Sequence, residues 1–293
     1  MSLQQNCPVP YKKKVRLSRH TTFGIGGPAQ FWAEPGDVSA LSDLVRWCRT
    51  RRMRIRVIGA GSNILVADRG VKGFVVKLNA PCFCGIARVN GRVIAGAGAP
   101  LARLIAFCAG AGLSGAEFLH GIPGTVGGAV AGNAGSGTLS IGDLVEFVVV
   151  MDYNGKISKL EAKDIGFSYR RSGLDNVIVL QVCMRLSVCA PSVIRRRIAQ
   201  YARMRRLTQG SGWRSAGCCF KNPGSESAGR LIDACGLKGS RCGRAVVSRI
   251  HANFILNDGR AAASDVRRLM RRITSAVKKK FGIRLEPEIR IWQ

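Results

Sequence analysis

The chain has 293 residues, and its 46 Lys and Arg outnumber its 17 Asp and Glu, which gives a formal net charge of 46 − 17 = +29. This length predicts two or three domains, and a content of 46% hydrophobic and 22% charged residues excludes a disordered chain. The longest apolar runs fall far short of the roughly 20 residues of a membrane span, and the N-terminus lacks the apolar core of a signal peptide, so we expect a cytoplasmic protein.

Short apolar runs separated by glycine clusters predict an alternating α/β region near residues 1–190. Two segments of this region have the apolar spacing of amphipathic helices. The predicted strands are Ile55–Ile58, Phe74–Leu78, Arg92–Ala95, Val145–Met151 and Val177–Val182, and the predicted helices are Val38–Cys48 and Leu101–Ala111.

A separate α+β domain is predicted after Pro191, over residues 191–293. Its three segments with helical apolar spacing lie between strand-like runs. The predicted helices are Ser192–Arg206, Ala228–Gly236 and Asp265–Phe281, and the predicted strands are Ala252–Leu256 and Ile283–Trp292.

The eleven cysteines and three histidines do not have the spacing of a metal site. The chain has no CxxC pair, and neither Cys82-x-Cys84 nor Cys218-Cys219 matches the usual zinc-ligand patterns. A disulfide framework is not expected in a cytosolic chain of this length. We therefore predict that most cysteines are small buried hydrophobic residues and that the protein binds no metal.

The glycine-rich segment Gly59-Ala-Gly-Ser-Asn63 follows a predicted strand and has two possible interpretations. Successive backbone N–H groups in such a loop can bind a phosphate, and the alternative is an ordinary tight turn. The segment is not the GxGxxG motif of a Rossmann fold, because Ile64 stands where the third glycine belongs, and the chain has no Walker A motif.

A second glycine-rich block, Gly121–Gly135, contains six glycines, one proline and no charged residue. A solvent-exposed loop is normally polar, so a segment with so few side chains indicates a large flat ligand that lies against the backbone. The alternative is the close-packed start of a helix in the core.

Eight segments, in sequence order, resemble motifs of the UDP-N-acetylenolpyruvoylglucosamine reductase (MurB) family. The resemblance covers residues 15–293, and the short span from Arg170 to Cys218 is similar to the second type of this family, which lacks an extra loop over the substrate. The segments are His20-Thr-Thr-Phe-Gly-Ile-Gly-Gly-Pro28, Gly59–Val66, Gly121–Gly135, Phe167-Ser-Tyr-Arg-Arg-Ser172, Gly217-Cys-Cys-Phe-Lys-Asn-Pro223, Gly236-Leu-Lys-Gly239, His251-Ala-Asn-Phe254 and Leu285-Glu-Pro-Glu-Ile289.

The resemblance implies an α+β (mixed α/β) fold with two domains. Residues 1–190 would form a two-part FAD-binding region of the PCMH type, from the vanillyl-alcohol-oxidase superfamily, with subdomains near 1–80 and 81–190. Residues 191–293 would form the substrate domain.

The resemblance also implies the cofactors and the reaction. NADPH reduces FAD, which then reduces UDP-N-acetylglucosamine enolpyruvate to UDP-N-acetylmuramate, a precursor of peptidoglycan. The preference for NADPH over NADH and the oligomeric state stay open. The residues implied to hold FAD are Gly59, Ala60, Gly61, Ser62, Asn63 and Ile64 in the first segment, and Gly121, Ile122, Pro123, Gly124, Thr125, Gly128 and Ala129 in the second.

Three residues match the family's catalytic positions. Arg170 matches an arginine whose guanidinium can bind a carboxylate through two parallel bonds while an enolate develops beside it. Glu288 matches a C-terminal glutamate that polarises the enolate end of the substrate, although the nearby Glu286 competes for this assignment. Cys218 stands where the family usually has a serine proton donor. A thiol, with an ordinary pKa of about 8.5, is more acidic than an alcohol, but the alternative is an inert Cys218 with water as the donor.

Five further residues match, or lie near, substrate contacts of the family. Gly132-Asn133 stands where the family usually has Met-Asn, so the wall of the site beside the flavin could differ from that of the family. The substrate contacts are Tyr169 and His251 in the wall, Asn222 at the substrate, Lys221 at the loop or the diphosphate, and Arg206 near the diphosphate.

Two other function classes stay open. The first is another PCMH-type FAD oxidoreductase, against which Tyr169-Arg170 and Phe220–Pro223 argue because they are substrate-side features. The second is a basic nucleic-acid-binding protein, which the charge suggests but which 6% aromatic residues and the lack of a known binding motif disfavour. Because 33 Arg stand against 13 Lys, we interpret the charge as a compositional bias.

Overall fold

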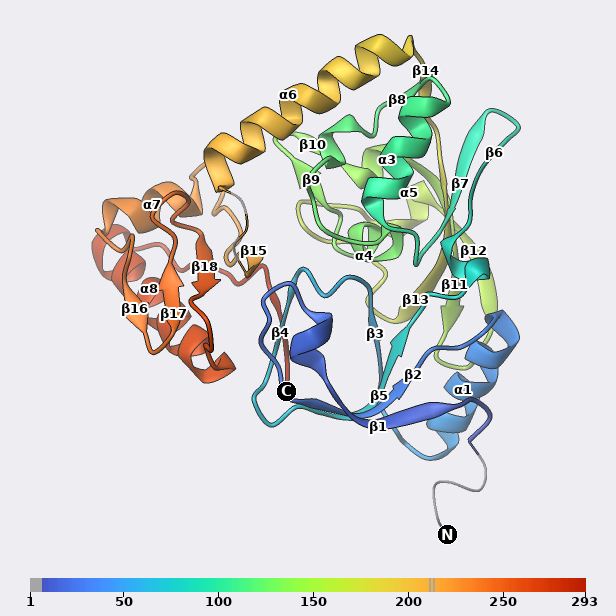
Figure 1. The fold of residues 1–293 in the computed structure, drawn as a ribbon, viewed down its shortest axis with the longest axis horizontal. Helices are drawn as coiled ribbons and strands as arrows, with labels where there is room; N and C mark the ends of the chain where they lie inside the picture. Colours follow the sequence, from blue (N-terminus) through green and yellow to red (C-terminus); the bar gives the residue numbers. More distant parts are fainter. Residues whose placement is uncertain (1–6, 211, 213) are drawn as a thin grey trace. The chain divides into compact units, whose positions relative to one another are not determined.

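The structure is a computed structural model that describes residues 7–210, 212 and 214–293. The chain divides into two compact units, each assembled from separate stretches of sequence (Figure 1). Unit 1 comprises the described residues of Met1–Lys13, Phe31–Ala60 and Gly73–Arg203, and unit 2 those of Lys14–Gln30, Gly61–Lys72 and Met204–Gln293. The predicted domains, residues 1–190 and 191–293, would divide the chain at one point. This division stays a prediction.

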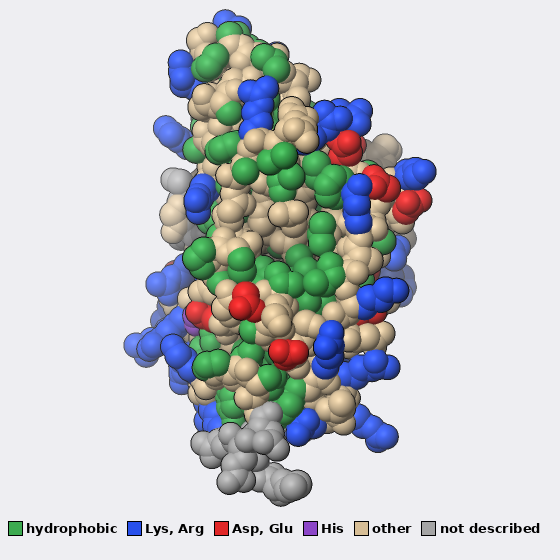
Figure 2. Space-filling view, turned by 90° about the vertical axis from the view of Figure 1, so that its right-hand side faces the viewer, with side chains coloured by type: hydrophobic (Ala, Val, Ile, Leu, Met, Phe, Trp, Pro, Cys, Tyr) green, Lys and Arg blue, Asp and Glu red, His purple; other side chains and the backbone are tan. Residues whose placement is uncertain are grey.

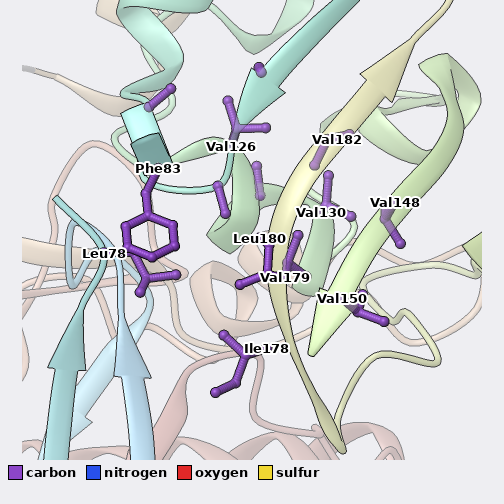
Figure 3. Packing of buried hydrophobic residues seen from close by; sticks show 14 of the residues in the cluster. Leu78, Phe83, Val126, Val130, Val148, Val150, Ile178, Val179, Leu180 and Val182 are labelled. Carbon is purple, nitrogen blue, oxygen red and sulfur yellow. The ribbon is translucent and has the colours of Figure 1, made fainter. Parts of the chain in front are cut away.

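One sheet of unit 1 has five antiparallel strands in the order β12-β11-β13-β7-β6. Its central strand β13 is buried along most of its length, as its run of apolar residues predicts. Figure 3 shows Val126 and Val130 of helix α4 beside Leu180 of β13, all three in one buried cluster. The strands are β6 (Ile86–Val89), β7 (Arg92–Gly96), β11 (Val145–Asp152), β12 (Ile157–Glu161) and β13 (Val177–Met184).

A second sheet has the strand order β1-β2-β5-β3, with β3 and β5 parallel. Helix α1 packs on it through an apolar face, and the Trp47 ring meets Phe74 of β5 edge-on at 6.0 Å between centroids. The Asp37 side chain begins the helix by accepting a hydrogen bond from Ala40 N–H at 2.8 Å. The elements are β1 (Tyr11–Arg16), β2 (Pro28–Ala33), α1 (Val38–Thr50), β3 (Ile55–Ile58) and β5 (Val71–Lys77).

Short helices and two-stranded pairs complete unit 1 around these sheets. The last helix, α6, ends in residues of unit 2. The helices are α2 (Pro81–Cys84), α3 (Leu101–Gly110), η3 (Glu117–Leu119), α4 (Val126–Ala131), η4 (Ile141–Leu144), α5 (Ala162–Ile165) and α6 (Pro191–Gln209), and the pairs are β8 (Leu113–Ser114) with β14 (Ser187–Val188) and β9 (Gly135–Ser136) with β10 (Leu139–Ser140).

Unit 2 is built on an antiparallel sheet in the order β15-β18-β17-β16. Its core combines the buried faces of α7 and α8 with Phe23, Ile25 and Leu65, which come from the two N-terminal stretches of the unit. Strand β19 pairs in parallel with β4. The elements are η2 (Leu17–His20), β4 (Ile64–Val66), β15 (Ser215–Cys218), α7 (Ala228–Ala234), β16 (Arg241–Cys242), β17 (Ala245–Val247), β18 (Phe254–Asn257), α8 (Ala263–Phe281) and β19 (Arg290–Trp292).

The predicted mixed fold is confirmed, and the predicted helices lie within three residues of the observed ones. One predicted strand, Ile283–Trp292, is wrong over most of its length, since only Arg290–Trp292 is strand. Pro287 has no N–H group to donate and makes a single bridge, to Phe220, so the segment before β19 cannot form a regular ladder. The predicted strand Ala252–Leu256 is displaced to Phe254–Asn257, because residues 251–254 form a turn closed by a bond from Phe254 N–H to His251 C=O.

All eleven cysteines lie in the described part of the chain, and each is a free thiol. Among the described residues, no helix has both the length and the apolar character of a membrane-spanning segment.

Candidate active site

The two glycine-rich segments meet in unit 1. A Cβ atom added to Gly59 would lie 2.5 Å from Oγ1 of Thr125, so only glycine permits this approach. Thr125 also begins α4, because its Oγ1 accepts a hydrogen bond from Gly128 N–H. The structure therefore brings together Gly59 and the start of α4, which the sequence predicted as parts of one cofactor site.

The structure supports the packing alternative for part of the Gly121–Gly135 block, while a flat ligand against its exposed part stays a prediction. Gly127 is a packing glycine, because an added Cβ would lie 2.6 Å from Cβ of Ala97. Gly121, Pro123 and Gly128 are exposed instead. The block is therefore a short helix packed against the core that presents an exposed, uncharged backbone on its other side.

Arg170 lies at the corner of a tight turn in unit 1. Ser168 and Arg171 exchange two backbone hydrogen bonds of 3.1 Å, which leaves Tyr169 and Arg170 at the tip. Arg170 has a left-handed backbone with φ of +54°, a conformation that is strained for a non-glycine residue. Its guanidinium carbon lies 5.5 Å from the Tyr169 ring centroid, and Tyr169 is exposed.

The end of α4 and the segment that follows it hold this turn in place. Arg170 Nη2 donates to Gly135 C=O at 3.1 Å, and the Ser172 hydroxyl donates to Ala131 C=O at 2.9 Å. Asn133, buried and also left-handed, donates to Ser168 C=O at 2.8 Å. These contacts tie the predicted catalytic arginine to the glycine-rich block.

Cys218 ends strand β15 in unit 2, directly after a break in the ladder. The register between β15 and β18 shifts between Ser215 and Cys218, and Gly217 in the gap has φ of +75°. A bulge of this kind turns the next side chain away from the regular alternation of a strand. No atom of the described residues lies within 4 Å of a Cβ added to Gly217, so its backbone conformation, rather than crowding, favours glycine there.

The segment that carries Glu288 lies beside the Cys218 segment. Glu288 N–H donates to Cys219 C=O at 2.8 Å, and Asn63 Nδ2 donates to Glu288 C=O at 3.2 Å. Within unit 2, the structure thus brings together the two candidate catalytic segments and one residue of the predicted cofactor loop.

Glu286 makes a different contact from Glu288. Its carboxylate pairs with Lys221 Nζ at 2.8 Å, and its backbone C=O accepts from Lys221 N–H at 2.9 Å. The Lys221 side chain is 16% exposed and that of Glu286 is 69% exposed. The choice of Glu288 over Glu286 as the catalytic carboxylate stays a prediction.

The two adjacent cysteines differ in their surroundings. Cys219 is fully buried, and burial raises the pKa of its thiol to about 12. Cys218 is only half-buried. Of the two thiols, Cys218 is the one that a ligand can reach.

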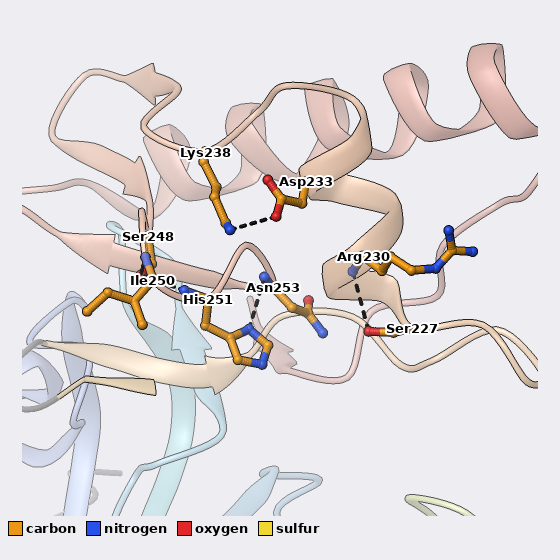
Figure 4. A network of polar contacts seen from close by, with 8 residues as sticks. All are labelled: Ser227, Arg230, Asp233, Lys238, Ser248, Ile250, His251 and Asn253. Carbon is orange, nitrogen blue, oxygen red and sulfur yellow. Dashed lines mark hydrogen bonds and ion pairs between the residues drawn. The ribbon is translucent and has the colours of Figure 1, made fainter. Parts of the chain in front are cut away.

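The other predicted substrate contacts have varied surroundings in unit 2. Asn222 Oδ1 accepts from Ala228 N–H at 3.0 Å at the start of α7, so that atom has a local structural role. Arg206 is exposed in the last turn of α6. Figure 4 shows the His251 ring beside Asn253; its Nδ1 accepts from Asn253 N–H at 3.2 Å, and burial lowers the pKa of the imidazole.

A cavity of about 450 Å³ in unit 2 contains none of the predicted site residues. No cluster of three or more His, Cys, Asp or Glu side chains suited to a metal ion occurs among the described residues. The cavity is lined by Ser18, Arg19, Thr21, Thr22, Gly24 and Arg214.

Two family models match successive parts of the chain. The model described as "FAD binding domain" matches residues 29–161, and the one described as "UDP-N-acetylenolpyruvoylglucosamine reductase, C-terminal domain" matches residues 208–292. The reductase of that name from Moorella thermoacetica is 42% identical over 277 residues, which cover 94% of this chain and 91% of that protein. The one from Desulfosudis oleivorans is 41% identical over 289 residues, with 94% and 92% covered.

The chain belongs to the UDP-N-acetylenolpyruvoylglucosamine reductase family. The resemblance predicted from the sequence motifs is therefore confirmed, and the chain is an FAD-dependent oxidoreductase. The crystal structure of the family member from Thermus caldophilus is 38% identical, has a TM-score of 0.83 and covers 97% of this chain and 99% of that one. A solvent-stable cholesterol oxidase, 16% identical with a TM-score of 0.52 over 64% of this chain and 40% of that chain, shares the fold alone.

The FAD of the UDP-N-acetylenolpyruvoylglucosamine reductase family fits the residues around α4. Gly121 and Gly128 are exposed and lack side chains, and no residue from Gly121 to Gly135 carries a charge that would repel a phosphate. Backbone N–H groups there can approach a flat ligand closely.

Sequence reasoning missed Asn133, Ser172 and Asn253, all buried polar residues beside the candidate catalytic segments of this family member. Each lies inside or next to a motif that carried the resemblance, which was the only available signal. Their partners are backbone groups 33 to 41 residues away, which no local pattern reveals.

Proposed function

We propose that the chain is a UDP-N-acetylmuramate dehydrogenase. It reduces UDP-N-acetylglucosamine enolpyruvate to UDP-N-acetylmuramate, with NADPH as the reductant and FAD as the hydride carrier. The hydrogen bond between Glu288 N–H and Cys219 C=O carries this proposal, because it sets a carboxylate and a half-buried thiol on adjacent segments. Reductases of this name at 41–42% identity support it.

When bound, FAD would supply a hydride, obtained from NADPH, to C3 of the enolpyruvyl double bond. As this bond is consumed, negative charge develops at C2 and on the adjacent carboxylate. Arg170 binds that carboxylate through its guanidinium, and its fixed turn orients it before the substrate arrives. Glu288 polarises the enolate end of the substrate.

Cys218 donates the proton that completes the reaction. Its S–H bond breaks as a C–H bond forms at C2, and the resulting thiolate regains a proton from water. A positioned general acid of this kind contributes about 10²- to 10⁴-fold to a rate. Cys219 cannot share the role, because it is fully buried and its pKa is raised to about 12.

We assign the remaining contacts in the same way. The cofactor binds at Gly59–Ile64, through its diphosphate, and along Gly121–Ala129, within a domain of residues 1–190. Residues 191–293 form the substrate domain. Arg206 and Lys221 bind the diphosphate of the UDP-sugar, while Tyr169, Asn222 and His251 line the substrate. The enzyme acts in the cytoplasm, in peptidoglycan synthesis, and so supports cell shape and cell division.

A direct assay tests the function. The purified protein is expected to show the absorption bands of bound flavin and to oxidise NADPH only when UDP-N-acetylglucosamine enolpyruvate is present. Formation of UDP-N-acetylmuramate is measured by mass spectrometry. Flavin binding with no response to this substrate would instead support another PCMH-type oxidoreductase.

A further inference from the structure

Asn253 forms an unusual set of bonds with the segment that carries Cys218. Its side chain is 2% exposed, its Oδ1 accepts from Phe220 N–H at 3.0 Å, and its Nδ2 donates to Phe220 C=O at 2.8 Å. Its own backbone C=O accepts from Cys219 N–H at 2.8 Å. One residue therefore satisfies three backbone groups of Cys219 and Phe220, next to the candidate proton donor.

The side-chain amide of Asn253 extends the hydrogen bonding between the two segments beyond the last backbone pair of β15 and β18. The pairing of β15 with β18 stops at Cys218 opposite Phe254. Two residues beyond Cys218, the Asn253 side chain offers Phe220 one donor and one acceptor, as a neighbouring strand would. The segment thereby keeps a fixed position past the end of the sheet.

The other side of the same segment holds Glu288. Cys219 C=O accepts from Glu288 N–H, and Lys221 N–H donates to Glu286 C=O. The segment from Cys218 to Lys221 is thus held between Asn253 on one side and residues 286–288 on the other. A shift of Phe220 would change the positions of both Cys218 and Glu288.

We propose that Asn253 is a positioning residue that fixes Cys218 relative to Glu288 for proton delivery. The inference rests on the proposed function of those two residues. No other common side chain of this length provides both a neutral donor and an acceptor, so alanine leaves buried backbone groups unpaired and aspartate loses the donor.

The chain offers a matched control four residues further on, at the end of β18. Asn257 is 5% exposed, donates to Phe23 C=O at 2.9 Å and accepts from Ala261 N–H at 2.9 Å. Like that of Asn253, its buried side-chain amide donates one hydrogen bond and accepts another, but it makes no bond to the Cys218 segment. Asn257→Ala measures the general cost of removing such an amide.

The test compares the two half-reactions in FAD-loaded Asn253→Ala and Asn257→Ala. We expect both variants to lose comparable thermal stability. In Asn253→Ala, reoxidation of the reduced flavin by substrate falls about tenfold to a hundredfold, while reduction by NADPH stays within about twofold, since only the reoxidation needs the proton donor. In Asn257→Ala both rates stay within about twofold. Asn253→Asp, which keeps the shape and one acceptor, gives a smaller loss and serves if the alanine variant does not fold.

A double-variant cycle separates this inference from the proposed function. If Asn253 acts through Cys218, the effect of Asn253→Ala shrinks when Cys218→Ala is already present. The positioning role would be overturned if Asn253→Ala and Asn257→Ala lowered the rate of flavin reoxidation equally. It would also be overturned if the rate losses of Asn253→Ala and Cys218→Ala simply multiplied in the double variant. If Cys218→Ala alone reoxidises at the normal rate, the assigned role of Cys218 fails instead.

Discussion

Position 218 has a thiol where the resemblance to the family implies a serine, so we expect two substitutions there to differ in the size of their effect. We expect Cys218→Ala to lower the rate of flavin reoxidation by substrate about 10²-fold or more, because the proton donor is lost. Cys218→Ser keeps a donor and stays within about tenfold of the parent chain. Stopped-flow absorbance of the flavin measures both; a normal rate in the alanine variant would leave water as the donor.

Alkylation reports on the same residue without mutation. Iodoacetamide should modify Cys218 and spare Cys219, because Cys219 is fully buried and burial holds the pKa of its thiol at about 12. Bound substrate should slow the alkylation of Cys218. Peptide mass spectrometry locates the label, and labelling of Cys219 in the folded protein would contradict the assigned accessibility.

The two nearby glutamates should differ in which kinetic constant they change. Glu288→Gln removes a charge beside the Cys218 segment and is expected to lower kcat. Glu286→Gln releases Lys221 from its ion pair and is expected to change KM for the UDP-sugar with a smaller effect on kcat. Steady-state kinetics distinguishes them, and the reverse pattern would assign the catalytic role to Glu286.

At the scale of elements, α8 takes its N-terminal cap from a distant part of the chain. The residue before the helix, Ala262, has no side-chain acceptor, and Asp68 accepts instead from Ala263 N–H at 2.7 Å and Ser264 N–H at 3.0 Å. Asp68→Ala should therefore lower the free energy of unfolding by about 1–2 kcal/mol. Urea titration measures the change.

The exposed Asp43 of α1 provides the control for that prediction. Asp43→Ala removes the same charge without removing a cap, so we expect little change in stability. If both variants lose the same free energy of unfolding, the change in net charge causes the loss, and the cap of α8 does not.

At the scale of the whole molecule, the charge of +29 is spread out. On the face drawn in Figure 2, Lys and Arg side chains stand in separate groups, with acidic and apolar side chains between them. Such a surface predicts weak, non-specific retention on DNA-cellulose that is lost as salt rises from 50 to 200 mM. Column elution measures this, and sequence-selective binding that persists at higher salt would restore the nucleic-acid alternative.

The sequence predicted elements well wherever a local apolar period determines them, as in α1, α8 and β3. It failed at Ile283–Trp292, where Pro287 interrupts a run that reads as a strand. The motifs predicted that Cys218 and Glu288 share a site, but the pairing of their two segments depends on the bonds of Cys219 to Glu288 and Asn253, which lie far away in the sequence. Local periodicity contains no information on such pairs.

The pairing of β4 with β19 joins Ile64–Val66 to Arg290–Trp292, more than 220 residues apart. During synthesis, the stretches 14–30 and 61–72 therefore emerge long before the residues that complete their core. Phe23, Ile25 and Leu65 must wait with their apolar surface uncovered until the C-terminal stretch arrives. Unit 2 thus folds late, and its early stretches are the part of the nascent chain that most needs protection from aggregation.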